Sequence, residues 1–117
     1  MAISNLDNVA SAISAISNTQ VFSICTNNKV VIPANIATPV MTANSKRSYA
    51  VIVNSGDAPI TLVLGDGNTT SGTFGQGILL TAKGSSFEIT NINLFIGKVL
   101  AISQSAASLS FVECSFG

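Results

Sequence analysis

Short runs in which apolar and polar residues alternate dominate the chain from residue 47 onwards. The clearest alternation, at residues 47–54, divides the side chains of an extended strand between two faces: Tyr49, Val51 and Val53 on one, and Ser48, Ala50, Ile52 and Asn54 on the other. Further β-patterned runs, with turn-forming residues between them, occupy residues 21–26, 29–33, 60–64, 78–81, 86–90, 98–103 and 109–114. About eight short strands at this spacing predict an all-β fold, a small β-sandwich or barrel of jelly-roll-like topology.

The connections between these runs carry predictions of their own. Asn27-Asn28 is expected to form a two-residue hairpin turn, because asparagine tolerates the positive φ that such turns need. Residues 34–45 contain Pro39 and no dense pattern, which indicates an extended arm or an edge strand. Residues 65–77 hold five of the nine glycines and are expected to form a long loop.

Residues 2–20 are the helical candidate of this sequence. An apolar stripe, with spacings of four, three, four and three residues, runs along them: Ala2, Leu6, Val9, Ile13 and Ile16. Asn5 or Asp7 is suited to cap the start of this helix. The stripe indicates either a helix that docks on a partner or joins an oligomer, or a helix that packs on the chain's own sheet. The expected domain division is an N-terminal helix or arm at 1–20 and a β-sandwich domain at 21–117.

Charge is scarce along this chain. Only 9% of its 117 residues are charged, against about 25% in an average soluble domain. Five Lys and Arg balance five Asp and Glu, so no basic patch for nucleic acid or for a membrane surface is expected. Weakly charged, neutral surfaces tend to associate. This favours a surface covered in an assembly over the alternative, a secreted β-domain with a neutral polar exterior.

The N-terminus and the two cysteines indicate whether the chain is exported and whether its surroundings are oxidising. The first residues show no cationic region followed by an unbroken apolar run, so we expect no secretory signal peptide. Cys25 and Cys114 both lie in strand-like runs, and two buried reduced thiols are expected, because free cysteine behaves as a small core residue. The alternative, a disulfide between the early strand and the last strand, needs an oxidising setting.

Few residues of this chain are suited to catalysis. Histidine is absent, which removes Ser-His-Asp and Cys-His catalysis and the commonest metal ligand. The two cysteines lack zinc-ligand spacing, and Asp57 and Asp66 each sit beside glycine in a turn. Residues 65–77 depart from phosphate-, dinucleotide- and calcium-binding patterns. We therefore predict no catalytic residue, no cofactor and no metal, and we interpret these residues as a surface loop in which Phe74 is a candidate partner-binding anchor.

Several motifs taken together resemble small bacteriophage virion proteins. They lie at residues 49–56, 60–67, 77–89 and 93–103, within a stretch that covers about half of the chain. In order, they are a strand ending in Asn-x-Gly, a Gly-rich loop, a Gly-Ser-x-x-Glu turn and strand, and an Asn-Leu-x-x-Gly-x-Val-x-Ala-Ile strand. Proteins of this group serve as head decoration (cement) proteins and as tail-tip or fibre components.

The resemblance implies a structural virion protein, and its favoured role is capsid decoration, in which the chain binds and stabilises the phage head shell. The implied partners are the major capsid protein and further copies of this chain, as a trimer or dimer. The implied location is the capsid surface of the virion, after synthesis in the host cytoplasm. Alternatives are a tail-tip or fibre module and a secreted β-sandwich adhesin, which a disulfide would favour. The candidate residues for contact with the oligomer or shell are Leu6, Val9, Ile13, Ile16 and Phe74.

Overall fold

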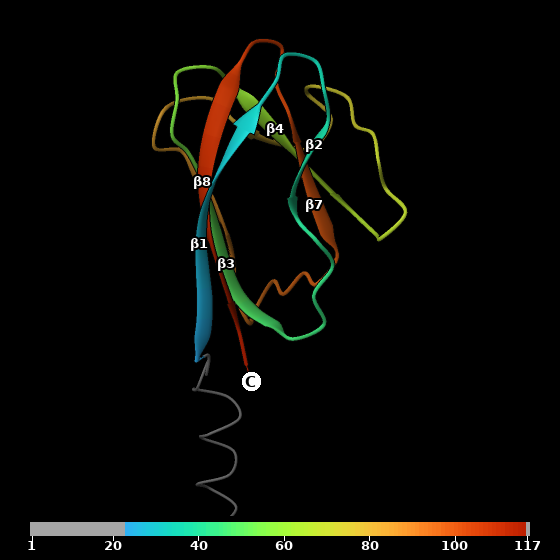
Figure 1. The fold of residues 1–117 in the computed structure, drawn as a ribbon, viewed down its shortest axis with the longest axis vertical. Helices are drawn as coiled ribbons and strands as arrows, with labels where there is room; N and C mark the ends of the chain where they lie inside the picture. Colours follow the sequence, from blue (N-terminus) through green and yellow to red (C-terminus); the bar gives the residue numbers. More distant parts are fainter. Residues whose placement is uncertain (1–22, 117) are drawn as a thin grey trace, which may run out of the picture.

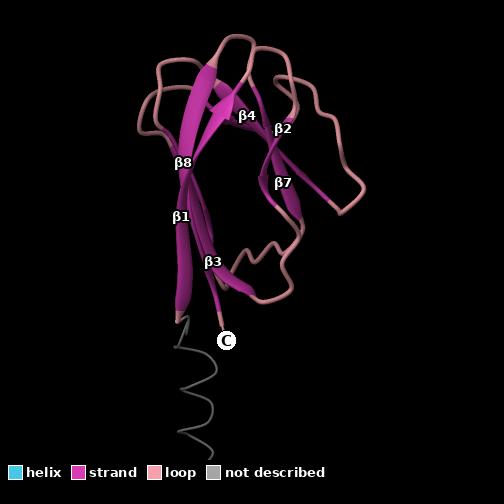
Figure 2. Cartoon of the chain, in the orientation of Figure 1, coloured by secondary structure: helices cyan, strands magenta, loops and turns pink. Residues whose placement is uncertain are grey.

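Two four-stranded antiparallel sheets face one another in this protein (Figures 1 and 2). The computed structural model describes residues 23–116, and every regular element within them is a strand. The strands are β1 (Ile24–Ile32), β2 (Thr38–Met41), β3 (Arg47–Asn54), β4 (Ile60–Gly65), β5 (Ile78–Leu80), β6 (Ser86–Ile89), β7 (Lys98–Ile102) and β8 (Ala107–Ser115).

Strands alternate between the two sheets along most of the chain. One sheet has the order β1-β8-β3-β6 and the other has the order β2-β7-β4-β5. This interleaving is that of a jelly roll, so the expected all-β sandwich is confirmed. In Figure 1, β1, β8 and β3 stand side by side, and β2 and β7 lie across from them.

The core lies between the sheets, where the alternating patterns place it. On β3, Ala50 and Ile52 are buried, whereas Val51 and Val53 on the opposite face are half-buried. This confirms the two faces predicted for residues 47–54. Residues from both sheets complete the core, among them Ile32, Ile60, Leu62, Leu80, Ile89, Val99 and Leu109.

The first described strand differs from its prediction. Asn27 and Asn28 do not turn the chain; they lie inside β1, which pairs with β8 from Ile24 opposite Ser115 to Ile32 opposite Ala107. The predicted hairpin is therefore wrong. An isolated two-stranded hairpin is marginally stable in water, whereas the nine-residue strand β1 is one of four strands in its sheet and places Ile32 in the shared core.

Other predicted elements agree with the structure. Residues 34–45 contain the short edge strand β2, with Pro39 inside it, as expected for an edge. Residues 66–77 form a loop between β4 and β5. The predicted helix at 2–20 lies outside the described residues.

We expect Gly77→Ala to destabilise the fold. Gly77 has a φ of 154°, which side-chain-bearing residues rarely adopt, and a Cβ there would collide with the backbone carbonyl oxygen of Leu62. Backbone strain of this kind costs about 1–3 kcal/mol. Gly67→Ala is the matched control, since a Cβ on Gly67 meets nothing within 4 Å. Urea denaturation measures both, and equal midpoints for the two variants would contradict this account.

Candidate functional site

The outer part of β1 is the most exposed regular element of the described chain. All six residues from Ile24 to Lys29 are exposed, and within β1 only Ile32 is buried. β1 stands at the edge of its sheet and pairs on one side with β8. We call residues 24–29 the free edge. It leaves two strand faces and one row of backbone groups open to other molecules.

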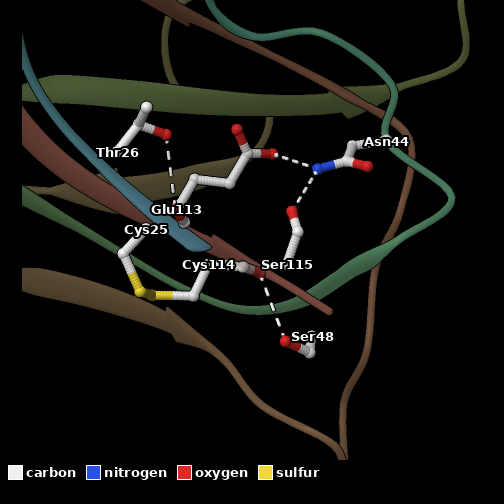
Figure 3. Close-up of a disulfide and its surroundings, with 7 residues drawn as sticks. All are labelled: Cys25, Thr26, Asn44, Ser48, Glu113, Cys114 and Ser115. Carbon is white, nitrogen blue, oxygen red and sulfur yellow. Dashed lines mark hydrogen bonds between the residues drawn. A yellow bond between two sulfur atoms is a disulfide. The ribbon is translucent and has the colours of Figure 1, made fainter. Parts of the chain in front are cut away.

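A disulfide joins the free edge to β8 (Figure 3). Cys25 lies directly opposite Cys114 in the ladder, and the two sulfur atoms are bonded. The prediction of two reduced thiols is therefore wrong. Because the two cysteines are 89 residues apart in sequence, only the strand pairing brings them together. Cys114 is 2% exposed, whereas Cys25 is exposed, so the bond fastens an open strand to a covered one.

The disulfide also shows which backbone groups face outwards. The Cα atoms of Cys25 and Cys114 are 4.0 Å apart, which is the close spacing of a non-hydrogen-bonded antiparallel pair. The backbone N–H and C=O of such a residue point away from its partner strand, and every second residue shares this direction. The outward groups of the free edge therefore belong to Cys25, Asn27 and Lys29.

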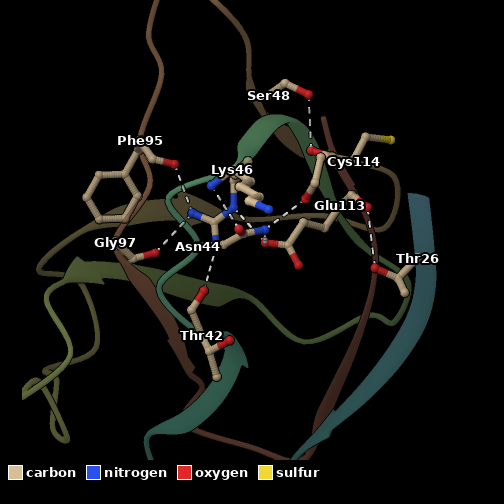
Figure 4. Close-up of polar contacts among 11 residues, drawn as sticks. Thr26, Thr42, Asn44, Lys46, Ser48, Phe95, Gly97, Glu113 and Cys114 are labelled. Carbon is tan, nitrogen blue, oxygen red and sulfur yellow. Dashed lines mark hydrogen bonds and ion pairs between the residues drawn. The ribbon is translucent and has the colours of Figure 1, made fainter. Parts of the chain in front are cut away.

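A buried arginine contacts Glu113, the residue that precedes Cys114, and Figure 4 labels its acceptors Thr42, Phe95, Gly97 and Glu113. Arg47, at the start of β3, is 0% exposed, and its Nε donates to Glu113 Oε2 on β8 at 2.7 Å. Its guanidinium also donates to three backbone carbonyls, those of Thr42, Phe95 and Gly97. One side chain thus ties β8 to the segment that follows β2 and to the segment that precedes β7.

Sequence reasoning missed this arginine, although the pattern held a signal. Glu113 is two residues from Phe111 and four from Leu109 on β8, so all three side chains share the core-facing side of the strand. An acidic side chain on the core-facing side of a strand needs a buried cation or hydrogen-bond donors. Arg47, at the start of the neighbouring strand β3, supplies both.

Exposed apolar side chains gather where the described chain begins and ends. Ile24 lies opposite Ser115, whose hydroxyl accepts from Asn44 Nδ2 at 2.9 Å. The Asn44 backbone N–H donates to Ile96 O at 2.8 Å. These contacts place the start of β1, the end of β8 and the loop after β6 side by side. We call the exposed apolar residues there the apolar end: Ile24, Ile92, Leu94, Ile96 and Phe116.

The residues predicted for the interface are placed differently. Phe74 is half-buried in the loop between β4 and β5, apart from the residues of the apolar end. Leu6, Val9, Ile13 and Ile16 lie outside the described residues. Their part in an interface stays a prediction. The sequence did not single out Ile92, Leu94 or Ile96, because the run around them was interpreted as a short connection.

The turn acid Asp66 has a local partner. Asp66 Oδ1 accepts from the Asn68 backbone N–H at 2.8 Å, which is the hydrogen bond of a polar turn. Within residues 23–116, no three His, Cys, Asp or Glu side chains gather as a metal site would require. The described part of the chain also holds no pocket and no helix of the length and apolarity needed to cross a membrane.

Tyr49 and Glu88 form a polar pair on the outer face of the first sheet. The Tyr49 hydroxyl donates to Glu88 Oε2 at 2.6 Å. This hydrogen bond, followed by partial burial and the negative charge of Glu88, raises the pKa of Tyr49 above its usual value of about 10. Stability from the neutral phenol is therefore complete below pH of about 10 and is lost as the pH rises through the folded-state pKa.

We expect Glu88→Ala to lower the pKa of Tyr49 towards its usual value, because the substitution removes both the hydrogen bond and the nearby charge. Tyr49 is the one tyrosine of the chain, so tyrosinate absorbance during a pH titration reports on it alone. Asp66→Asn, which removes a charge elsewhere, is the control. Identical titration midpoints for Glu88→Ala and the unmodified protein would contradict the pairing.

Comparisons with known proteins leave the family open. No family model matches the chain, and no curated protein matches it. Among solved structures, a chain from Bacillus endospore appendages, described as a family of disulfide-linked pili, shares 20% sequence identity at a TM-score of 0.41. The match covers 85% of this chain and 95% of that one. Similarity at this level defines neither the family nor the function.

Proposed function

We propose that this protein is a structural subunit of a protein assembly and that it joins neighbouring chains through the free edge of β1. The observation that carries the proposal is the exposure of all six residues 24–29 on an edge strand. An edge strand with open backbone groups accepts an incoming strand, and main-chain hydrogen bonds then provide affinity. The proposed role is non-enzymatic.

The chain does little to block this edge. Proteins protect edge strands with charges, prolines, bulges or covering loops. Between Ile24 and Asn28 there is no charge and no proline; Lys29 is the one charged residue of β1, and Pro33 follows the strand. The disulfide fastens the edge in its extended shape before any partner arrives. A strand ordered in advance loses less conformational entropy on binding.

The setting we propose is the outside of a cell or of a virion. Disulfides persist in oxidising environments and are rare in reducing cytosol. We propose capsid decoration as the particular role, with the major capsid protein and further copies of this chain, as a trimer or dimer, as partners. That choice rests on the sequence resemblance to virion proteins. The alternative within a virion is a tail-tip or fibre module, which would also be structural but would occur in few copies per particle.

A secreted β-sandwich adhesin is the second candidate, and the disulfide between Cys25 and Cys114 is the observation that favours it. Both candidates use the same oxidised sandwich as a structural part. They differ in where the protein accumulates, on particles or on the cell surface, so fractionation of the source material separates them.

Asn27→Pro tests the free edge directly. Proline removes the outward N–H of Asn27 and leaves the hydrogen bonds between β1 and β8 in place. Asn27→Ala is the matched control, because it removes the side chain and keeps the N–H. Sedimentation velocity of the full chain should show assembly for the unmodified protein and for Asn27→Ala, and monomers for Asn27→Pro. A monomeric unmodified protein, or unchanged assembly of Asn27→Pro, would overturn the proposal.

A further inference from the structure

The apolar end is a concentrated hydrophobic surface on a chain with little charge. Of the eight exposed large apolar side chains among the described residues, five belong to it. Ile92, in the loop between β6 and β7, is 92% exposed, and such exposure is unusual for an isoleucine. Apolar surface gathered in this way marks a binding site for another apolar surface.

We propose that the apolar end is the docking site for residues 2–16 of the same chain. These residues lie outside the described structure, and their sequence supplies the complementary element, a helical stripe of Leu6, Val9, Ile13 and Ile16. An amphipathic helix that lays its apolar face on a hydrophobic surface is a recurrent mode of recognition.

The dimensions fit this arrangement. A helix of residues 2–16 is about 22 Å long. The apolar end extends from β1, at one edge of its sheet, to the loop after β6, at the other edge. Three inter-strand steps of about 4.8 Å separate those edges, about 14 Å in all. One helix therefore has the length to cover the surface from Ile24 to Ile92.

The connection favours the chain's own segment over that of a second copy. The described chain begins at Ser23, next to Ile24, so the segment leaves the domain at the margin of the apolar end itself. Residues 17–22 provide a short tether, and such tethers give effective concentrations on the order of millimolar. The charges are also complementary, since Asp7 is the one charged side chain of residues 1–22 and the apolar end has a lysine next to it. This lysine is Lys46, whose backbone carbonyl accepts from the Phe116 N–H at 3.2 Å.

Hydrogen exchange of the full-length, oxidised protein tests this docking. The experiment compares amide exchange of residues 2–16 in three proteins, each at low and high concentration. They are the unmodified chain, the double variant Ile92→Asp with Leu94→Asp, and Leu79→Asp. Leu79, on the edge strand β5, is 47% exposed against 49% for Leu94, so it is a matched control away from the apolar end. Unchanged exchange of β8 amides verifies that each variant is folded.

Docking within one chain predicts exchange at least about ten-fold slower than that of a free peptide. This protection should be independent of concentration, persist in Leu79→Asp and disappear in the double variant. Three results would overturn the proposal. They are unprotected residues 2–16 in the unmodified protein, protection that survives the double variant, and protection that appears only at high concentration, which would assign the surface to a second copy.

Discussion

Replacing Arg47 by methionine is expected to lower the free energy of unfolding by about 3–5 kcal/mol, the usual cost of breaking a buried ion pair from one side. Arg47 is fully buried, and its removal leaves the carbonyls of Thr42, Phe95 and Gly97 without this donor. The Glu113 carboxylate loses its ion pair and keeps only the longer hydrogen bond from Asn44 Nδ2, at 3.3 Å. Methionine keeps most of the side-chain volume, so the effect measured is loss of charge and hydrogen bonds rather than a cavity.

Two further substitutions separate the parts of this interaction. Arg47→Lys keeps the positive charge but lacks the planar fork that reaches several acceptors at once, so its loss of stability should be intermediate. Lys46→Ala, at the exposed neighbouring position, should change stability by less than about 0.5 kcal/mol. Guanidinium denaturation measures all three. An Arg47→Met variant as stable as Lys46→Ala would show that the buried pair does not hold this end together.

Loss of the disulfide is the second large expected effect. The Cys25→Ala, Cys114→Ala double variant should lose about 2–5 kcal/mol, because the bond closes a loop of 89 residues and so restricts the unfolded chain. The residues it fastens bury little: the first six residues of β1 are exposed. The disulfide therefore replaces core packing as the constraint on this half of the strand.

The effect of reductant provides the control for this prediction. Denaturation midpoints of the unmodified protein should fall when a reductant is added, whereas those of the double variant should not change. Hydrogen exchange should accelerate most in residues 24–29, since the inner part of β1 keeps Ile32 in the core. An unmodified protein whose midpoint is insensitive to reductant would contradict the role given to the disulfide.

The sequence predicts the parts of the fold that depend on local alternation. Val51 and Ile52 take opposite faces of β3 because side chains of a strand alternate, and the connections after β3 and β4 fall at runs rich in Gly, Asp and Asn. Pairing over long distances is a different matter. Nothing local to Asn27 indicates that residues 107–115 lie beside it. The local pattern therefore predicted a turn where the structure has a continuous strand.

The candidate site was harder to predict for the same reason. Cys25 and Cys114 bond because of the β1–β8 register, and the apolar end combines a strand start, a strand end and a loop far apart in sequence. The sequence held two signals of these contacts. One was the alternative of a disulfide between the early and the last strand, and the other, which was not used, was Glu113 as an acid two residues from Phe111 on the core-facing side of its strand. The alternation of side chains thus predicted the sandwich, whereas the free edge and the apolar end depend on tertiary contacts.

The most direct test of the central claim, a structural subunit working in an oxidising setting, is to measure where the protein resides in its source. Particles and free proteins are separated by size under non-reducing conditions, and quantitative mass spectrometry then follows this chain and the state of Cys25 and Cys114. We expect most copies to occur in large assemblies with the disulfide formed. A predominantly monomeric, reduced protein in the cytosolic fraction would contradict this claim.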